Sequence, residues 1–142
     1  MQALTLLASA GAARAQIGNP APEFVPVEWI NSPSVYLEEL RGKAVLIEVF
    51  RTWSEECTTQ EPGLSARYEK DAARGLVVIG VTDEAPDAVA RWVRIHEPSY
   101  PVVAIQGNEF ERALGARGDW FPIEAVIDAQ GTFAAGELTR AA

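Results

Sequence analysis

Cysteine and histidine are the scarcest chemistry-bearing residues of this 142-residue chain, with one of each. A single Cys57 excludes any disulfide within the chain, structural or catalytic. With His96 as the sole imidazole, the chain also lacks the ligands for a His/Cys metal cluster of ordinary size. No glycine-rich phosphate-binding loop occurs in the sequence. We therefore expect neither a metal nor another cofactor.

Basic residues are also few in this chain. Lys and Arg number 12 against 20 Asp and Glu, which gives a net charge of -8 and a pI near 4.6. Nucleic acids and anionic membrane surfaces both attract proteins through basic side chains, so this balance disfavours either as a partner. The hydrophobic content of 48% suits one globular domain with a core of its own.

The N-terminal segment is apolar but short. Residues 1–16 cannot span a bilayer, and they include Ala13-Arg14-Ala15, a small-x-small pattern that a signal peptidase could cut. We predict that residues 1–15 are a signal-peptide remnant and that residues 16–142 form a single domain, exported to a periplasmic or equivalent space and not inserted in the membrane. The alternative for residues 1–15 is an Ala-rich tail.

Strand and helix patterns alternate along the chain. Apolar, β-branched runs bounded by turn residues predict strands, and Ser54 followed by two glutamates predicts a capped helix that Gly75 ends. The expected strands are residues 24–30, 44–50, 76–81, 100–105, 123–128 and 132–135; the expected helices are residues 54–74, 86–96 and 108–114, with one turn in 34–40. This order predicts an α/β fold with a central mixed sheet, flanking helices and a C-terminal hairpin.

Three motifs in fixed order resemble the thioredoxin-like superfamily. They are the segment 53–57 (WSEEC), Pro62 five residues later, and Phe121-Pro122 before the final hairpin. The likeness is strongest to the exported, TlpA-type thiol-disulfide oxidoreductases and to the redoxins related to alkyl hydroperoxide reductase. It implies the thioredoxin fold from about residue 17 to 136, a cis peptide before Pro122, and a chain that stops where the last helix of the family would begin.

The resemblance also assigns roles. In that family a strand delivers W-C-x-x-C to a helix N-terminus, where the helix favours the thiolate form. Ser54 stands in place of the attacking cysteine, and because a hydroxyl cannot exchange disulfides, the two-thiol cycle cannot run within this chain. Glu48 matches the buried proton acceptor of thioredoxin, and burial should raise its pKa. The alternatives for Glu48 are contact with water or an ion pair with Lys43 or Arg51.

Cys57 is subject to opposing effects. The helix N-terminus lowers a thiol pKa, whereas the adjacent Glu55 and Glu56 raise it, and the second cysteine of the family is normally shielded. We therefore expect Cys57 to be a poor nucleophile.

Three functions remain open from the sequence. The first is an atypical thiol-disulfide oxidoreductase that forms mixed disulfides between Cys57 and a protein thiol, with Ser54 and Glu48 as its other catalytic residues. The second is a redox-inactive module that binds an extended peptide or a partner protein. Its expected binding residues are Trp53, Trp120, Phe121 and Pro122.

The third function is a one-cysteine peroxidase. Residues 54–60 (SEECTTQ) resemble the segment around a peroxidatic cysteine, but Phe50 and Pro122 stand where that family has a proline and an arginine. Without the arginine, attack on peroxide should be slow. A laboratory exchange of cysteine for serine at position 54 would also give this sequence, although the unusual Glu-Glu pair favours natural divergence.

Overall fold

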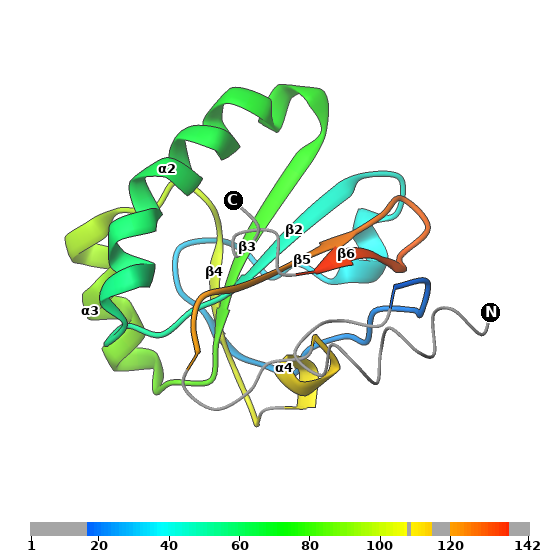
Figure 1. Ribbon diagram of the computed structural model, residues 1–142. Helices are drawn as coiled ribbons and strands as arrows, with labels where there is room; N and C mark the ends of the chain where they lie inside the picture. The colour runs from blue at the N-terminus through cyan, green and yellow to red at the C-terminus, as the bar shows by residue number, and fades with distance from the viewer. Residues whose placement is uncertain (1–16, 108, 115–119, 137–142) are drawn as a thin grey trace.

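The computed structural model describes residues 17–107, 109–114 and 120–136 (Figure 1). The predicted signal-peptide remnant and the final residues 137–142 lie outside this range. In chain order the elements are β1 (Pro26–Trp29), η1 (Leu37–Leu40), β2 (Ala44–Val49), α2 (Glu55–Asp71), η2 (Ala72–Arg74), β3 (Leu76–Thr82), α3 (Pro86–His96), β4 (Val102–Ile105), α4 (Glu109–Ala113), β5 (Ile123–Ile127) and β6 (Phe133–Gly136).

The strands form one mixed sheet in the order β1-β4-β3-β2-β5-β6. Strand β3 pairs in parallel with both β2 and β4, whereas β1, β5 and β6 pair antiparallel to their neighbours. The structure therefore confirms the predicted α/β thioredoxin fold, its central mixed sheet and its closing hairpin. Strand β1 is at the sheet edge, as its prolines predict.

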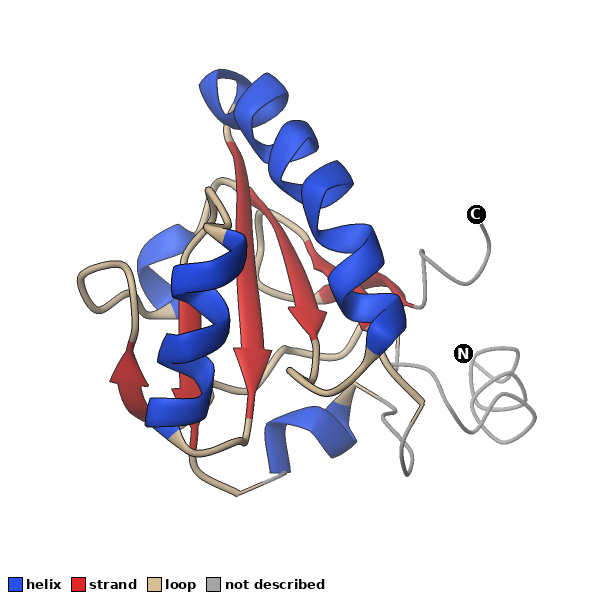
Figure 2. Cartoon of the chain, turned by 90° about the vertical axis from the view of Figure 1, so that its left-hand side faces the viewer, coloured by secondary structure: helices blue, strands red, loops and turns tan. Residues whose placement is uncertain are grey.

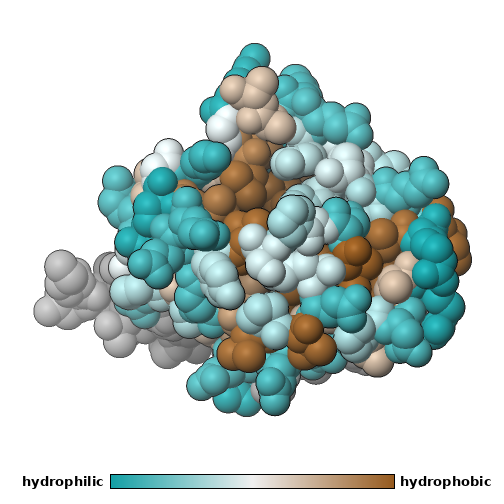
Figure 3. All heavy atoms as spheres, turned by 180° about the vertical axis from the view of Figure 1, so that it is seen from behind, coloured by the Kyte–Doolittle hydropathy of each residue, from teal (hydrophilic) through white to brown (hydrophobic). Residues whose placement is uncertain are grey.

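Helices α2 and α3 lie side by side over one face of the sheet (Figure 2), and α4 lies on the other side (Figure 1). The inner strands β2, β3 and β4 carry most of the buried aliphatic side chains, which is why their sequences read as almost continuous apolar runs. Seen from behind, hydrophobic groups appear in separate areas among hydrophilic ones (Figure 3).

Helix α2 begins as the sequence predicts. Ser54 has extended backbone angles, and its hydroxyl accepts a hydrogen bond from the Cys57 N–H at 3.2 Å, which satisfies one of the free donors of the first turn. The helix continues into the 3-10 turn η2, and Gly75 follows with a φ of 101°, a left-handed conformation that glycine adopts without steric cost. The predicted boundaries of 54–74 are therefore close to those observed.

Candidate functional site

Two chain segments meet at the end of β2. Residues 50–54 connect β2 to α2, and the cis peptide Phe121-Pro122 immediately precedes β5. Strands β2 and β5 are paired with Val49 opposite Ile123, so the sheet register places Pro122 beside the start of the β2–α2 loop. The cis bond inferred from the family resemblance is confirmed, and it lies at the same end of the sheet as Ser54.

Cys57 lies in the first turn of α2 and is 2% exposed. Ser54, which caps the same helix, is 7% exposed. Burial raises the pKa of the Cys57 thiol to about 11, although hydrogen bonds from the Ser54 side chain and the Arg51 backbone act to lower it. The charges of Glu48 and Glu56 act with burial and raise the pKa further. At neutral pH Cys57 is therefore a protonated, shielded thiol, in agreement with the expectation of a poor nucleophile.

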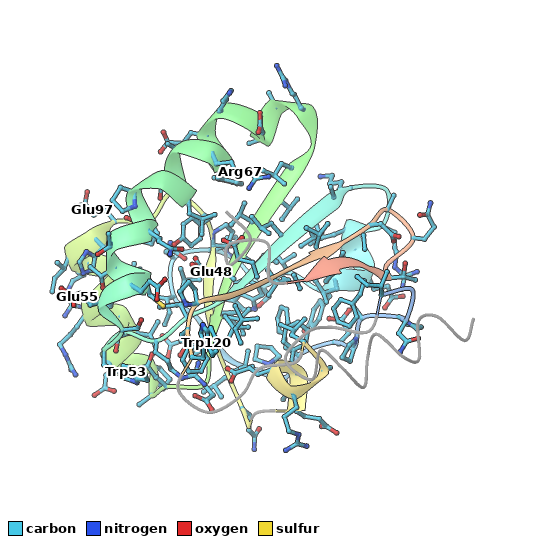
Figure 4. All side chains as sticks on the ribbon, in the orientation of Figure 1. Glu48, Trp53, Glu55, Arg67, Glu97 and Trp120 are labelled. Carbon is cyan, nitrogen blue, oxygen red and sulfur yellow. The ribbon has the colours of Figure 1, made fainter. Side chains whose placement is uncertain are left out.

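Glu48 lies between α2 and the sheet and is 3% exposed (Figure 4). It is directly opposite Glu124 in the β2–β5 ladder, and Glu61 of α2, itself 4% exposed, is close enough to repel its charge. Burial, followed by repulsion from Glu124 and then Glu61, raises the pKa of Glu48 to about 8. The predicted rise is confirmed, and Glu48 is largely protonated at neutral pH.

Arg51 does not pair with Glu48, which corrects one alternative from the sequence. Its guanidinium donates to both carboxylate oxygens of Glu111 at 2.7 and 3.1 Å and forms an ion pair with Asp83 at 3.0 Å. Arg51 is 8% exposed, so these partners offset the cost of burying its charge. Sequence reasoning missed this contact because Glu111 lies 60 residues along the chain, in α4.

The same arginine supports the aromatic side of the site. Its guanidinium carbon is 4.2 Å from the centroid of the Phe121 ring, and the Trp53 ring meets Phe121 edge-on with centroids 6.1 Å apart. Phe121 is buried, so both contacts restrict its ring. Arg51 thus links α4 and the start of α2 to the residue that precedes the cis proline.

The loop before α2 is held by a second set of hydrogen bonds. Thr52 donates from its backbone N–H and its hydroxyl to the Glu84 carboxylate at 2.8 and 2.7 Å, and the Thr82 hydroxyl donates to the same carboxylate at 2.8 Å. These bonds tie the residue next to Trp53 to the end of β3. The backbone that presents Trp53 is therefore firmly positioned.

A surface pocket of about 400 Å³ opens at the start of α2. It is lined by Trp53, Ser54, Glu55, Glu56, Trp120 and Phe121. Trp53 is 61% exposed and Trp120 55% exposed, whereas Trp92 is buried in the core. Figure 4 shows Trp53 and Trp120 near the start of α2, at the same end of the molecule as Glu55. The structure thus brings together Trp53, Ser54, Trp120 and Phe121, four of the residues that the sequence singled out.

The fold and this site define a thioredoxin-fold protein of the redoxin class. Residues 17–135 match the model of the AhpC/TSA family, and the chain belongs to that family. It is similar to the thiol-disulfide oxidoreductase ResA of Bacillus thuringiensis, with 27% identity over 117 residues, 82% of this chain and 66% of ResA. It is also 31% identical to the protein DipZ of Mycobacterium bovis over 134 residues, 87% of this chain and 19% of DipZ.

A solved structure has the same architecture. The thiol:disulfide interchange protein of the thioredoxin family from Chlorobium tepidum superposes with a TM-score of 0.71 at 26% identity, covering 89% of this chain and 88% of that one. The chain spans less than two thirds of the length of ResA and under a fifth of DipZ, so the similarity concerns one part of each longer protein.

Two further features bear on the site. Within the described part of the chain, no helix has the length and apolar character needed to cross a membrane. Among the same residues, no group of three His, Cys, Asp or Glu side chains is arranged to hold a metal ion.

Proposed function

We propose that this chain binds an extended polypeptide segment at the Trp53–Trp120 pocket and that its thiol chemistry is suppressed. A contrast in exposure carries the proposal: the two tryptophans of the pocket are more than half exposed, whereas Cys57, in the first turn of α2, is 2% exposed. An exposed aromatic pair is a costly feature unless it meets a partner, and tryptophan is the residue most enriched among binding hot spots.

The site supports recognition without chemistry. Phe121, which carries the Arg51 guanidinium on its ring, meets the Trp53 ring edge-on, and Thr52 is fixed by Glu84, so a ligand would meet a preorganised surface. The cis-proline Pro122 follows Phe121, a residue of the pocket wall, and is itself buried.

Thiol exchange is disfavoured on two grounds. Attack on a disulfide requires a thiolate, and a pKa of about 11 keeps Cys57 protonated at neutral pH. Ser54 supplies no second sulfur, so a mixed disulfide at Cys57 could not be resolved within the chain. Mixed disulfides at Cys57, the first function considered from the sequence, therefore require the first turn of α2 to open. A thiol from another molecule would then have to complete the cycle.

The apolar start of the sequence supports an exported location for this domain, in the periplasm or an equivalent space. In such an oxidising compartment an exposed lone thiol would be liable to couple with other molecules. Burial of Cys57 protects the chain from that outcome and is consistent with a binding role.

Binding is tested with extended peptides that contain no cysteine, by titration followed through tryptophan fluorescence and by calorimetry. We expect Trp53→Ala and Trp120→Ala each to weaken binding about tenfold, the range of a moderate hot spot. Cys57→Ser should leave affinity unchanged, since Cys57 is buried and does not line the pocket. Loss of binding in Cys57→Ser, with the fold intact by circular dichroism, would contradict the proposal.

A peroxidase is the second candidate, because the chain belongs to the AhpC/TSA family and Ser54 lies against the Cys57 backbone. It predicts consumption of hydrogen peroxide with a sulfenic acid on Cys57. The burial of that thiol and the engagement of Arg51 by Glu111 and Asp83 weigh against it. Peroxide turnover with an added thiol reductant would reverse this order of preference.

A further inference from the structure

The charge of the Trp53–Trp120 pocket is one-sided. Six described residues line it, and the two that ionise are Glu55 and Glu56. The other walls are the indole rings, the Phe121 ring and the Ser54 hydroxyl. We propose that this pocket selects a cationic side chain, lysine or arginine, of an extended peptide. This inference rests on the proposed function and specifies the chemistry of its partner.

Aromatic walls are suited to a cation. The face of an indole ring is electron-rich and attracts ammonium and guanidinium groups more strongly than other aromatic rings do. Trp53 and Trp120 are both more than half exposed, so their rings are accessible to a ligand. The aliphatic stem of a lysine or arginine can pack on the same rings while its charged end reaches a carboxylate.

The position of the two glutamates favours the same occupant. They lie in the first turn of α2, where the helix contributes roughly half a positive charge, so two full negative charges more than compensate for it. An anionic ligand at this helix terminus is disfavoured for the same reason. The Ser54 hydroxyl also already accepts the Cys57 N–H, one of the donors that an anion would otherwise use.

Arg51, which lies on the Phe121 ring of the pocket wall, does not offset these two charges. Arg51 is buried, and its guanidinium is bound by Glu111 and Asp83, so its charge is compensated locally. The chain as a whole carries a net charge of -8, which attracts cationic ligands at low ionic strength. The charge of the pocket and the net charge of the chain therefore both favour a cationic ligand.

The test uses three peptides that are identical except for one central residue: arginine, glutamine or glutamate. We expect the arginine peptide to bind about tenfold more tightly than the glutamine peptide, and the glutamate peptide to bind most weakly. The double variant Glu55→Gln/Glu56→Gln keeps the shape of the pocket and should bring the arginine and glutamine peptides to nearly equal affinity.

The matched control is Glu69→Gln/Glu97→Gln, which changes the net charge by the same amount at exposed positions. Glu69 lies about 21 Å along α2 from Glu55, and Glu97 follows the C-terminal end of α3 (Figure 4). This control should retain the preference for arginine. If all three peptides bind equally, the proposed selectivity is refuted while peptide binding stands. If none binds, both proposals fail.

Discussion

The burial of Glu48 predicts an unusual dependence of stability on pH. Its pKa is about 8 in the folded protein against an ordinary value of 4.5, so the folded state holds a proton that the unfolded state releases. Below about pH 4.5 both states are protonated and Glu48 adds no pH dependence. Between these two pKa values the folded protein should lose stability as the pH rises, by about 1.4 kcal/mol for each pH unit.

The full difference between the two pKa values corresponds to about 5 kcal/mol in the free energy of unfolding. About 3 kcal/mol of this stability should be lost between about pH 5 and pH 7.5. The assay is urea unfolding followed by tryptophan fluorescence at constant ionic strength, with wild type and Glu48→Gln measured in parallel. The variant carries a neutral side chain of the same shape, so its curve should lack this loss. The range ends at pH 7.5 because Cys57 begins to ionise in the unfolded chain above that value.

Two further variants test what raises the pKa of Glu48. Glu124→Gln removes the carboxylate that contributes most after burial, so the pKa of Glu48 should fall, and the loss of stability should end at a lower pH and be smaller. Glu69→Gln, exposed on α2, should leave the profile unchanged. If the free energies of unfolding of wild type and Glu48→Gln run parallel between pH 5 and pH 7.5, Glu48 is not protonated in the folded state and the reasoning fails.

Three other changes test the site. Cys57 should react with a chromogenic disulfide far more slowly in the native protein than in denaturant, since a pKa of about 11 against an ordinary 9.0 lowers the thiolate fraction about 100-fold, before the restricted access to the buried sulfur is considered; equal rates would refute this. Arg51→Met leaves Glu111 buried without its cation and should cost about 3 kcal/mol in urea unfolding, which Arg51→Met/Glu111→Leu should largely restore. Ser54→Cys should form a disulfide with Cys57 under oxidising conditions, detected by mass spectrometry, and failure to do so would show that the two positions are not in exchange geometry.

Much of the fold could be predicted because its signals are local. The run in β2 gives a buried strand, and Ser54 with its following glutamates gives the start of α2 without reference to any distant residue. The cis peptide before Pro122 is different in kind, because only the resemblance to a known family implied it. The exposed tryptophans of the pocket were also identified in advance, from their positions beside these motifs.

The electrostatics of the interior could not be predicted in the same way. Arg51 depends on Glu111, 60 residues distant, and the environment of Glu48 depends on one carboxylate from β5 and another from α2. Arg51, Glu111 and the two carboxylates around Glu48 would each be assigned to the surface if taken alone. A single sequence identifies Glu48 as an ionisable residue in an apolar strand, but the elements that pack around it determine whether it finds a cation or other acids.

The two buried charge clusters explain how recognition and redox chemistry can separate in this fold. The guanidinium of Arg51 lies on the Phe121 ring and pairs with Glu111 and Asp83, so its charge is compensated there. Burial acts on the Cys57 thiol in the opposite sense and raises its pKa, and the charges of Glu48 and Glu56 raise it further. A thiolate would need a nearby cation, and the cation of this site is engaged elsewhere. The scaffold therefore keeps an exposed aromatic surface, while burial keeps the remaining thiol protonated.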